Sequence, residues 1–168
     1  MIRIYLGNIL RFITLVLLQV LVFDNIRLGG YVTPFIYVLF IILLPFTVPK
    51  WLLLISAFFL GFVTDIFYNT LGMHAAACVF IAFLRPVILN IFAPRDGYET
   101  GTFPRIYYYG PEWFLKYSVS LIFLHHIVLF SIEVFSITEF HHILLRTFLS
   151  TLLTGLIVVI SQYFIYRR

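Results

Sequence analysis

WLLLISAFFLGFVTDIF, residues 51–67, is the stretch that decides the fold, because Asp65 is its only ionisable residue. A helix that crosses the hydrocarbon core of a bilayer needs about 20 predominantly apolar residues. Asn69 and Gly72 follow the stretch and are residue types that favour a turn. Residues 51–67 are therefore predicted to form a membrane-spanning helix.

The rest of the chain has the same apolar character. Its 168 residues are 62% hydrophobic and 11% charged, whereas a typical soluble domain carries about 25% charged residues. This composition excludes a soluble globular enzyme, and it excludes a disordered chain as well. The net charge of +4 comes without a basic run, so it does not indicate nucleic-acid binding. The single cysteine, Cys78, cannot form a disulfide within the chain.

Turn and breaker residues divide the chain into six apolar stretches. Backbone groups in hydrocarbon must be satisfied within each segment, and no alternating barrel pattern appears, so helices are expected. The prediction is an all-α, polytopic membrane bundle, a single domain over residues 1–168. Its six predicted transmembrane helices cover residues 4–23, 31–46, 51–67, 73–92, 113–135 and 143–166.

Lysine and arginine predict the orientation of this bundle. With six spans and an internal N-terminus, the cytoplasmic segments contain Arg3, Lys50, Arg95, Arg105, Lys116, Arg167 and Arg168, with Arg85 nearby. The opposite side contains Arg27 and Arg146 alone, while Arg11 lies within the first span. Because cytoplasmic loops carry an excess of such residues, both termini are expected in the cytoplasm.

Polar residues inside the first predicted span form a stripe. Asn8, Arg11 and Gln19 fall within about 80° on a helix that turns 100° per residue. Arg11 has two interpretations: it extends to the cytoplasmic interface on its long stem, or it belongs to the stripe. Gln19 has no route to the interface, so it is expected to hydrogen-bond to a neighbouring helix.

The third predicted span carries small residues and a carboxylate on one face. Ala57, Gly61 and Asp65 are spaced four residues apart, and small residues at that spacing permit two helices to approach closely. Asp65 is interpreted either as a solvated or capping residue at the outer boundary, or as a buried polar anchor for a neighbouring helix.

The other ionisable residues in the spans are assigned to packing. Arg85, before Pro86, lies too deep to pair with Asp65. It is expected to snorkel inward, toward the cytoplasmic interface, or to satisfy carbonyls freed by the proline. Adjacent His125 and His126 point about 100° apart and do not form a metal site. A cation site made by Glu133, Glu139, His141 and His142 is not favoured, because no ligand spacing supports it. Thr151 and Gly155 form a further small-residue pair.

Residues 33–49 (TPFIYVLFIILLPFTVP) lead, after Lys50, into residues 51–86 (WLLLISAFFLGFVTDIFYNTLGMHAAACVFIAFLRP). This region resembles the MreD family, the small multi-pass rod shape-determining membrane proteins of bacteria. The likeness is strongest over residues 34–95, around Gly61-x-x-x-Asp65, Gly72-Met73-His74-Ala75 and Arg85-Pro86. Chain length, number of spans and short tails agree with it.

The resemblance implies a non-enzymatic adaptor in the cytoplasmic membrane that helps to control cell shape. MreD-like proteins associate with MreC, and through it with the MreB filament, the RodA glycosyltransferase and the elongation transpeptidase of the cell-wall machinery. The implied fold is similar to the six-helix substrate-binding subunits of energy-coupling-factor vitamin transporters. No catalytic residue, cofactor or metal is implied. The candidate residues for MreC binding or helix packing are Gln19, Ala57, Gly61, Asp65, Gly72, Arg85 and Pro86.

Two other classes remain open. A substrate-binding subunit of a vitamin transporter is the main alternative, although such subunits usually carry an Ala-x-x-x-Ala patch on the first helix and residues 4–23 contain no alanine. A proton-coupled or metal transporter would need ionisable residues at one depth, for which His125 and His126 are the only support.

Overall fold

The computed structural model describes residues 2–25, 32–99, 101–134 and 140–166. These residues form helices and loops and no strand, so the all-α prediction is confirmed. The long helices are α1 (Ile2–Leu21), α3 (Lys50–Tyr68), α4 (Met73–Ile91), α5 (Ile106–Val134) and α6 (Phe140–Tyr166). The short elements are the 3₁₀ turns η1 (Phe23–Asn25) and η2 (Ile36–Val38) and the single-turn helix α2 (Leu39–Ile42).

Four of these helices, α3, α4, α5 and α6, are long and apolar enough to cross a membrane. A helix of 19 residues reaches about 28 Å at 1.5 Å per residue, which is close to the thickness of the hydrocarbon core. The part of α1 with described side chains, Leu6–Leu21, is apolar but shorter. Large apolar side chains are exposed on all five long helices, as expected where the solvent is lipid.

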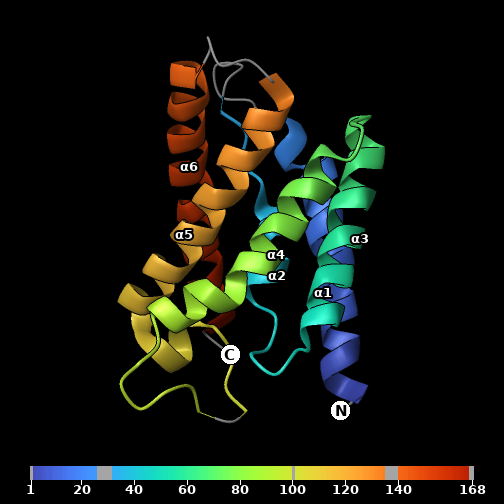
Figure 1. The fold of residues 1–168 in the computed structure, drawn as a ribbon. Helices are drawn as coiled ribbons and strands as arrows, with labels where there is room; N and C mark the ends of the chain where they lie inside the picture. Colours follow the sequence, from blue (N-terminus) through green and yellow to red (C-terminus); the bar gives the residue numbers. More distant parts are fainter. Residues whose placement is uncertain (1, 26–31, 100, 135–139, 167–168) are drawn as a thin grey trace.

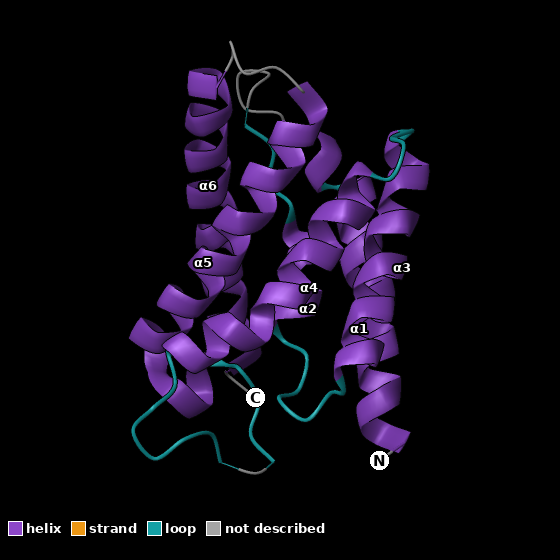
Figure 2. Cartoon of the chain, viewed as in Figure 1, coloured by secondary structure: helices purple, strands orange, loops and turns teal. Residues whose placement is uncertain are grey.

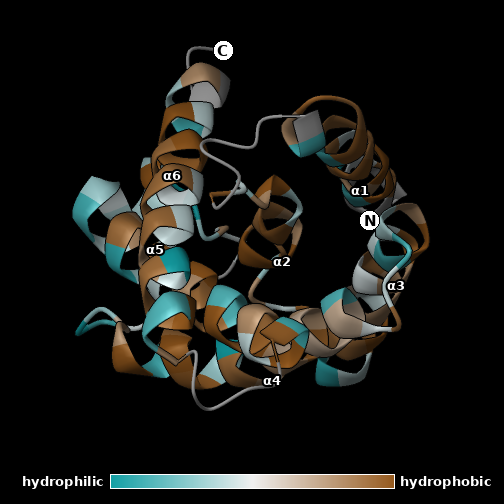
Figure 3. Ribbon diagram, turned by 90° about the horizontal axis from the view of Figure 1, so that it is seen from above, coloured by the Kyte–Doolittle hydropathy of each residue, from teal (hydrophilic) through white to brown (hydrophobic). Residues whose placement is uncertain are grey.

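The long helices surround a buried stretch of chain, residues 32–44, which we call the central segment (Figures 1 and 3). Helices α3 and α4 form one antiparallel hairpin and α5 and α6 another, and α4 packs on α5 to join the hairpins. Helix α1 lies against α3 and the central segment. Helix α1 starts, and helix α6 finishes, at the same end of the bundle (Figure 1). We call this the terminal end, and the opposite one the distal end.

The predicted continuous helix over residues 31–46 is wrong. In its place, residues 32–35 are extended, η2 and α2 form two short turns, and a loop begins at Leu43. Thr33 to Pro45 are buried throughout. Pro34 fixes its own φ and disfavours helical backbone at Thr33, so a helix cannot start before it.

The predicted boundaries of the other helices are close to those observed, except at α5. This helix begins at Ile106 rather than at residue 113, and Gly110 and Pro111 bend it. Gly110 has a φ of 80°, a left-handed backbone conformation that glycine adopts without steric cost. The predicted long polar stretch of residues 93–112 is therefore partly helical.

The loop between α4 and α5 lies at the terminal end (Figure 2), and aromatic side chains fix it. The Tyr98 hydroxyl donates to Leu89 O at 2.7 Å, and Trp113 Nε1 donates to Phe92 O at 2.7 Å. The Tyr98 ring also stacks on Phe46, with centroids 4.4 Å apart. Burial raises the pKa of Tyr98 to about 12, so its hydroxyl stays a donor at neutral pH.

Candidate functional site

The central segment brings backbone groups to membrane depth without a continuous helix to pair them. Such groups cost several kcal/mol each if they are left unsatisfied in hydrocarbon. Side chains from the surrounding helices supply the missing partners. Three of the polar residues that stand out in the predicted spans, Arg11, Gln19 and Arg85, have this role.

Gln19 on α1 pairs with the distal half of the central segment. Its Oε1 accepts from Ile36 N at 2.8 Å, and its Nε2 donates to Pro34 O at 3.1 Å. Nε2 also donates to the Tyr68 hydroxyl on α3 at 3.0 Å. Gln19 is fully buried, and these are the hydrogen bonds between segments that its position predicted.

Helix α6 contacts the same half of the segment through Thr154. Phe35 N donates to Thr154 Oγ1 at 3.2 Å. Thr154 belongs to a buried polar stripe along α6, which also includes Thr147, Ser150, Thr151 and Gln162. The small pair of Thr151 and Gly155 packs inside the chain, because a Cβ at Gly155 would lie 3.6 Å from Val119 Cγ2 on α5.

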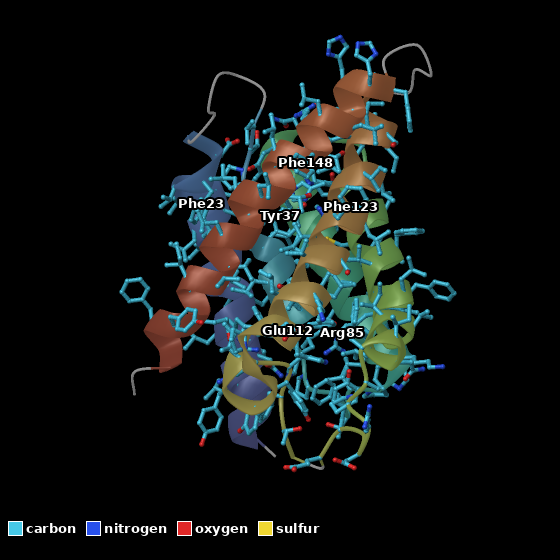
Figure 4. All side chains as sticks on the ribbon, turned by 90° about the vertical axis from the view of Figure 1, so that its left-hand side faces the viewer. Phe23, Tyr37, Arg85, Glu112, Phe123 and Phe148 are labelled. Carbon is cyan, nitrogen blue, oxygen red and sulfur yellow. The ribbon has the colours of Figure 1, made fainter. Side chains whose placement is uncertain are left out.

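Arg85 and Tyr117 pair with the terminal half of the central segment. Arg85 Nη2 donates to Leu44 O, and Arg85 Nε donates to the Tyr117 hydroxyl at 2.9 Å. That hydroxyl in turn donates to Ile42 O at 3.0 Å. Figure 4 shows Arg85 inside the bundle, closer than Tyr37 to the end where Glu112 lies.

The expectation for Arg85 was therefore wrong, because it named the wrong hydrogen-bond partner. Its side chain is 2% exposed, so it does not reach the interface. Its carbonyl partner belongs to the central segment and was not freed by Pro86, which lies half-buried within α4.

Arg11 also turns toward the central segment. Its Nη1 lies 3.3 Å from Leu43 O and 3.2 Å from Asn8 Oδ1. The stripe of Asn8, Arg11 and Gln19 thus faces the bundle interior. Arg11 had been interpreted either as extending to the cytoplasmic interface or as part of the stripe, and its contacts agree with the second interpretation.

Asp65 holds the corner between α3 and α4. Its Oδ1 accepts from His74 N at 3.0 Å and from Thr70 Oγ1, and its Oδ2 accepts from Ala75 N at 2.9 Å. The side chain is 3% exposed, so Asp65 is a buried anchor that also caps the turn and the start of α4. It is not a solvated boundary residue.

Gly61 and Gly72 serve this corner in different ways. A Cβ on Gly61 would lie 2.5 Å from Ala75 N and from His74 O, so only glycine permits this approach of α4. Gly72 has open space where a Cβ would be, but its φ is 84°, so it supplies a left-handed turn. Ala57 is fully buried as well. The face of Ala57, Gly61 and Asp65 packs within the chain, and α4 occupies it.

A buried histidine and tyrosine cluster lies beside the central segment. The Tyr37 hydroxyl is 2.8 Å from His74 Nδ1 and 3.0 Å from His125 Nε2. Tyr37 has one proton, so it donates to one imidazole and accepts from the other. Sequence reasoning missed Tyr37 and His74: Tyr37 lies in an apolar run, and the only signal for His74 was its position after the Gly72 turn.

The neighbouring His126 faces away from this cluster. Its Nδ1 is 2.7 Å from Ile122 O and 3.4 Å from Thr151 Oγ1. The rings of His125 and His126 stand at 89° to each other, with centroids 5.5 Å apart, and the two side chains have different hydrogen-bond partners. Among the described residues no group of three or more histidine, cysteine or acidic side chains is arranged to hold a metal ion.

A polar pocket of about 170 Å³ opens at the distal end of the bundle. His74 and Phe35 connect it to the buried cluster, and Glu133 pairs with Arg146 at 2.9 Å in its wall. The other lining residues are Asp24, Thr33, Tyr68, Thr70, Met73 and Leu129. Of the residues considered for a cation site, His141 and His142 are exposed, and their ring centroids lie 4.0 Å apart with the planes tilted by 41°. Glu139 lies outside the described residues.

Comparison with known proteins gives no relative for this architecture: no family model, no curated protein and no solved structure matches the chain.

Proposed function

We propose that this chain is a non-enzymatic adaptor of the bacterial cell-wall elongation machinery, located in the cytoplasmic membrane and binding MreC. Through MreC it would join the MreB filament, the RodA glycosyltransferase and the elongation transpeptidase, and so contribute to cell shape. The observation that carries the proposal is the MreD-like region of residues 34–95. The motif residues of that region have a common structural task.

That task is to shape the bundle. Gly61, Asp65 and Gly72 form the corner between α3 and α4, while Arg85 holds the terminal half of the central segment. None of them forms an arrangement of nucleophile, base and oxyanion donor. Motif residues that build a rigid apolar body are what an adaptor needs, because helices associate in lipid by packing and by isolated hydrogen bonds.

The proposal includes six membrane crossings. Helices α1 and α3 to α6 would make five of them and the central segment the sixth, as in the six-helix subunits of energy-coupling-factor transporters. The bundle arrangement supports this, since the two described chain ends lie at one end (Figure 1). Lys50, Arg95, Arg105 and Lys116 lie on segments at that same end, which favours a cytoplasmic terminal end.

Cysteine labelling tests this topology. Cys78 is fully buried, so Cys78→Ala, which adds no polar group to the core, is the background that removes the only thiol of the sequence. Leu71→Cys, at a fully exposed distal position, should react with an impermeant maleimide added outside the cell. Glu99→Cys, in the terminal-end loop, should react only after the membrane is opened. Equal labelling of both positions in intact cells would contradict the topology.

Photo-crosslinking tests the adaptor role. Because α4 covers the Gly61 face, substitutions there would act on the fold, and exposed apolar positions are better probes. A photoreactive phenylalanine would replace, one at a time, Leu10, Phe58, Phe83, Leu115 and Leu152, which are exposed on five different helices. Crosslinks to MreC should concentrate on one or two adjacent helices, and the buried position Leu60 serves as the control. An absence of MreC from every crosslink would overturn the proposal.

The alternative function, substrate binding for a vitamin transporter, would use the distal pocket. At about 170 Å³ the pocket is smaller than the usual 300–1,000 Å³ of ligand sites, and the first helix lacks the alanine patch. Affinity purification of the tagged chain from its native membrane separates the two functions. The adaptor should carry MreC, whereas a transporter subunit should carry a stoichiometric small molecule.

A further inference from the structure

Helices α3 and α4 approach closely at the distal end and separate toward the terminal end (Figure 1). Gly61 permits the close approach, since a side chain there would collide with the backbone of Ala75 and His74. A wedge therefore opens between α3 and α4 on the half of the bundle that is nearer the chain termini.

An apolar groove of about 230 Å³ lies in this wedge. Leu53 and Ala82, both nearly fully buried, lie deepest, whereas Phe83 and Val87 are exposed at its edge. Leu54 and Pro86 complete the apolar lining. Apart from Lys50 at one end, the side chains that line the groove are apolar, so the groove is suited to a hydrocarbon chain.

Lys50 is the one charged residue that lines the groove, and it is exposed. It is the first residue of α3, about one turn or 5 Å nearer the membrane surface than Leu53 and Leu54 at 1.5 Å per residue. Lys50 has no ion pair among the described residues, whereas Lys116 at the same end pairs with Glu112 at 2.7 Å. Trp51, 64% exposed, follows Lys50 and is typical of the lipid headgroup level.

We propose that this groove is a binding site for an anionic phospholipid, a role beyond the adaptor function and independent of it. One acyl chain lies along Leu53, Ala82 and Pro86, and the headgroup phosphate pairs with the Lys50 ammonium. Charge complementarity selects the anionic headgroup, because a lysine near the membrane surface attracts acidic lipids. The separation of charge and groove along α3 matches the order of headgroup and chain in a phospholipid.

Native mass spectrometry of the purified full-length chain tests this site. Dioleoyl phosphatidylglycerol is the probe, and dioleoyl phosphatidylethanolamine is the zwitterionic comparison. Lys50→Gln should lower the affinity for phosphatidylglycerol about fivefold. It should lower that for phosphatidylethanolamine less, because the ammonium of that headgroup offsets the charge of the phosphate. Lys116→Gln, the matched control, should have little effect. Val87→Phe enlarges an exposed side chain at the edge of the groove and should weaken the binding of both lipids.

Each alternative result overturns the proposal. If Lys50→Gln keeps wild-type affinity for phosphatidylglycerol, Lys50 is not the headgroup contact. If Lys50→Gln and Lys116→Gln weaken binding equally, general surface charge accounts for the attraction. If Val87→Phe leaves both lipids bound as in the wild type, the acyl chain does not occupy the groove. Circular dichroism of each variant ensures that the comparison is between folded proteins.

Discussion

Gly61→Ala should lower the free energy of unfolding by about 3 kcal/mol, although it adds a single methyl group. The new Cβ would lie 2.5 Å from Ala75 N and from His74 O. Both are backbone atoms, so no rotation of a side chain relieves the collision and α4 must move away from α3. That movement would also stretch the hydrogen bonds from His74 N and Ala75 N to Asp65. Packing and capping are therefore lost together.

Two other helical glycines supply the controls. Gly7→Ala adds a methyl group with nothing within 4 Å and should be neutral or stabilise the chain by about 0.5–1 kcal/mol. Gly155→Ala makes an ordinary contact with Val119 and should be tolerated. Unfolding in mixed micelles with increasing dodecyl sulfate measures all three. A Gly61→Ala protein as stable as Gly7→Ala would show that α3 and α4 are not in this close contact.

The sequence predicted α3 and α4 well because composition and turn chemistry agree there. An apolar run ends at Asn69 and Gly72, and both residues adopt positive φ, as the turn signal implied. The four-residue spacing also placed Gly61 and Asp65 on one face. Spacing cannot identify what a face contacts, however, and only the structure shows that α4 covers this one.

The central segment could not be recognised from its sequence. Residues 36–44 are continuously apolar, and a segment buried on every side has no periodicity to distinguish a helix from an irregular chain. Pro34 fell inside the predicted span of residues 31–46, and Pro45 belonged to the break that ends it. In the structure they flank two short turns instead.

For a related reason, the sequence identified only some of the polar side chains that hydrogen-bond to the central segment. Gln19 and Arg85 stand out because amide and charged groups are costly in a span. Their partners are backbone atoms of Pro34, Ile36 and Leu44, and a backbone carbonyl or amide has no signature in a sequence. Tyr117 and Thr154, among the other supports, are residue types that occur in any apolar helix.

The dependence of the central segment on these side chains gives the second large prediction. Gln19→Met should lower the free energy of unfolding by about 3–5 kcal/mol. Methionine keeps the length and unbranched shape of glutamine, so little cavity is created. It leaves Ile36 N without its acceptor and Pro34 O without its donor, and each unpaired buried group costs about 1–3 kcal/mol. The bond from Nε2 to the Tyr68 hydroxyl is lost in addition.

Gln162→Met is the matched control for this substitution. Gln162 is also buried, at 4% exposed, but its Nε2 has no hydrogen-bond partner among the described residues. Removing an amide with an unpaired donor should be neutral or stabilising. A general sensitivity of the bundle to loss of a buried amide would instead destabilise both variants equally, and that outcome would contradict a specific role for Gln19.

Hydrogen exchange adds a local readout that global stability does not give. The Ile36 amide donates to Gln19 and the Phe35 amide donates to Thr154. In Gln19→Met the Ile36 amide should exchange faster while the Phe35 amide keeps its acceptor, and Thr154→Val should produce the reverse pattern. Unchanged exchange at Ile36 in Gln19→Met would mean that the central segment finds its hydrogen bonds elsewhere. The polar side chains of α1 and α6 would then not be its supports.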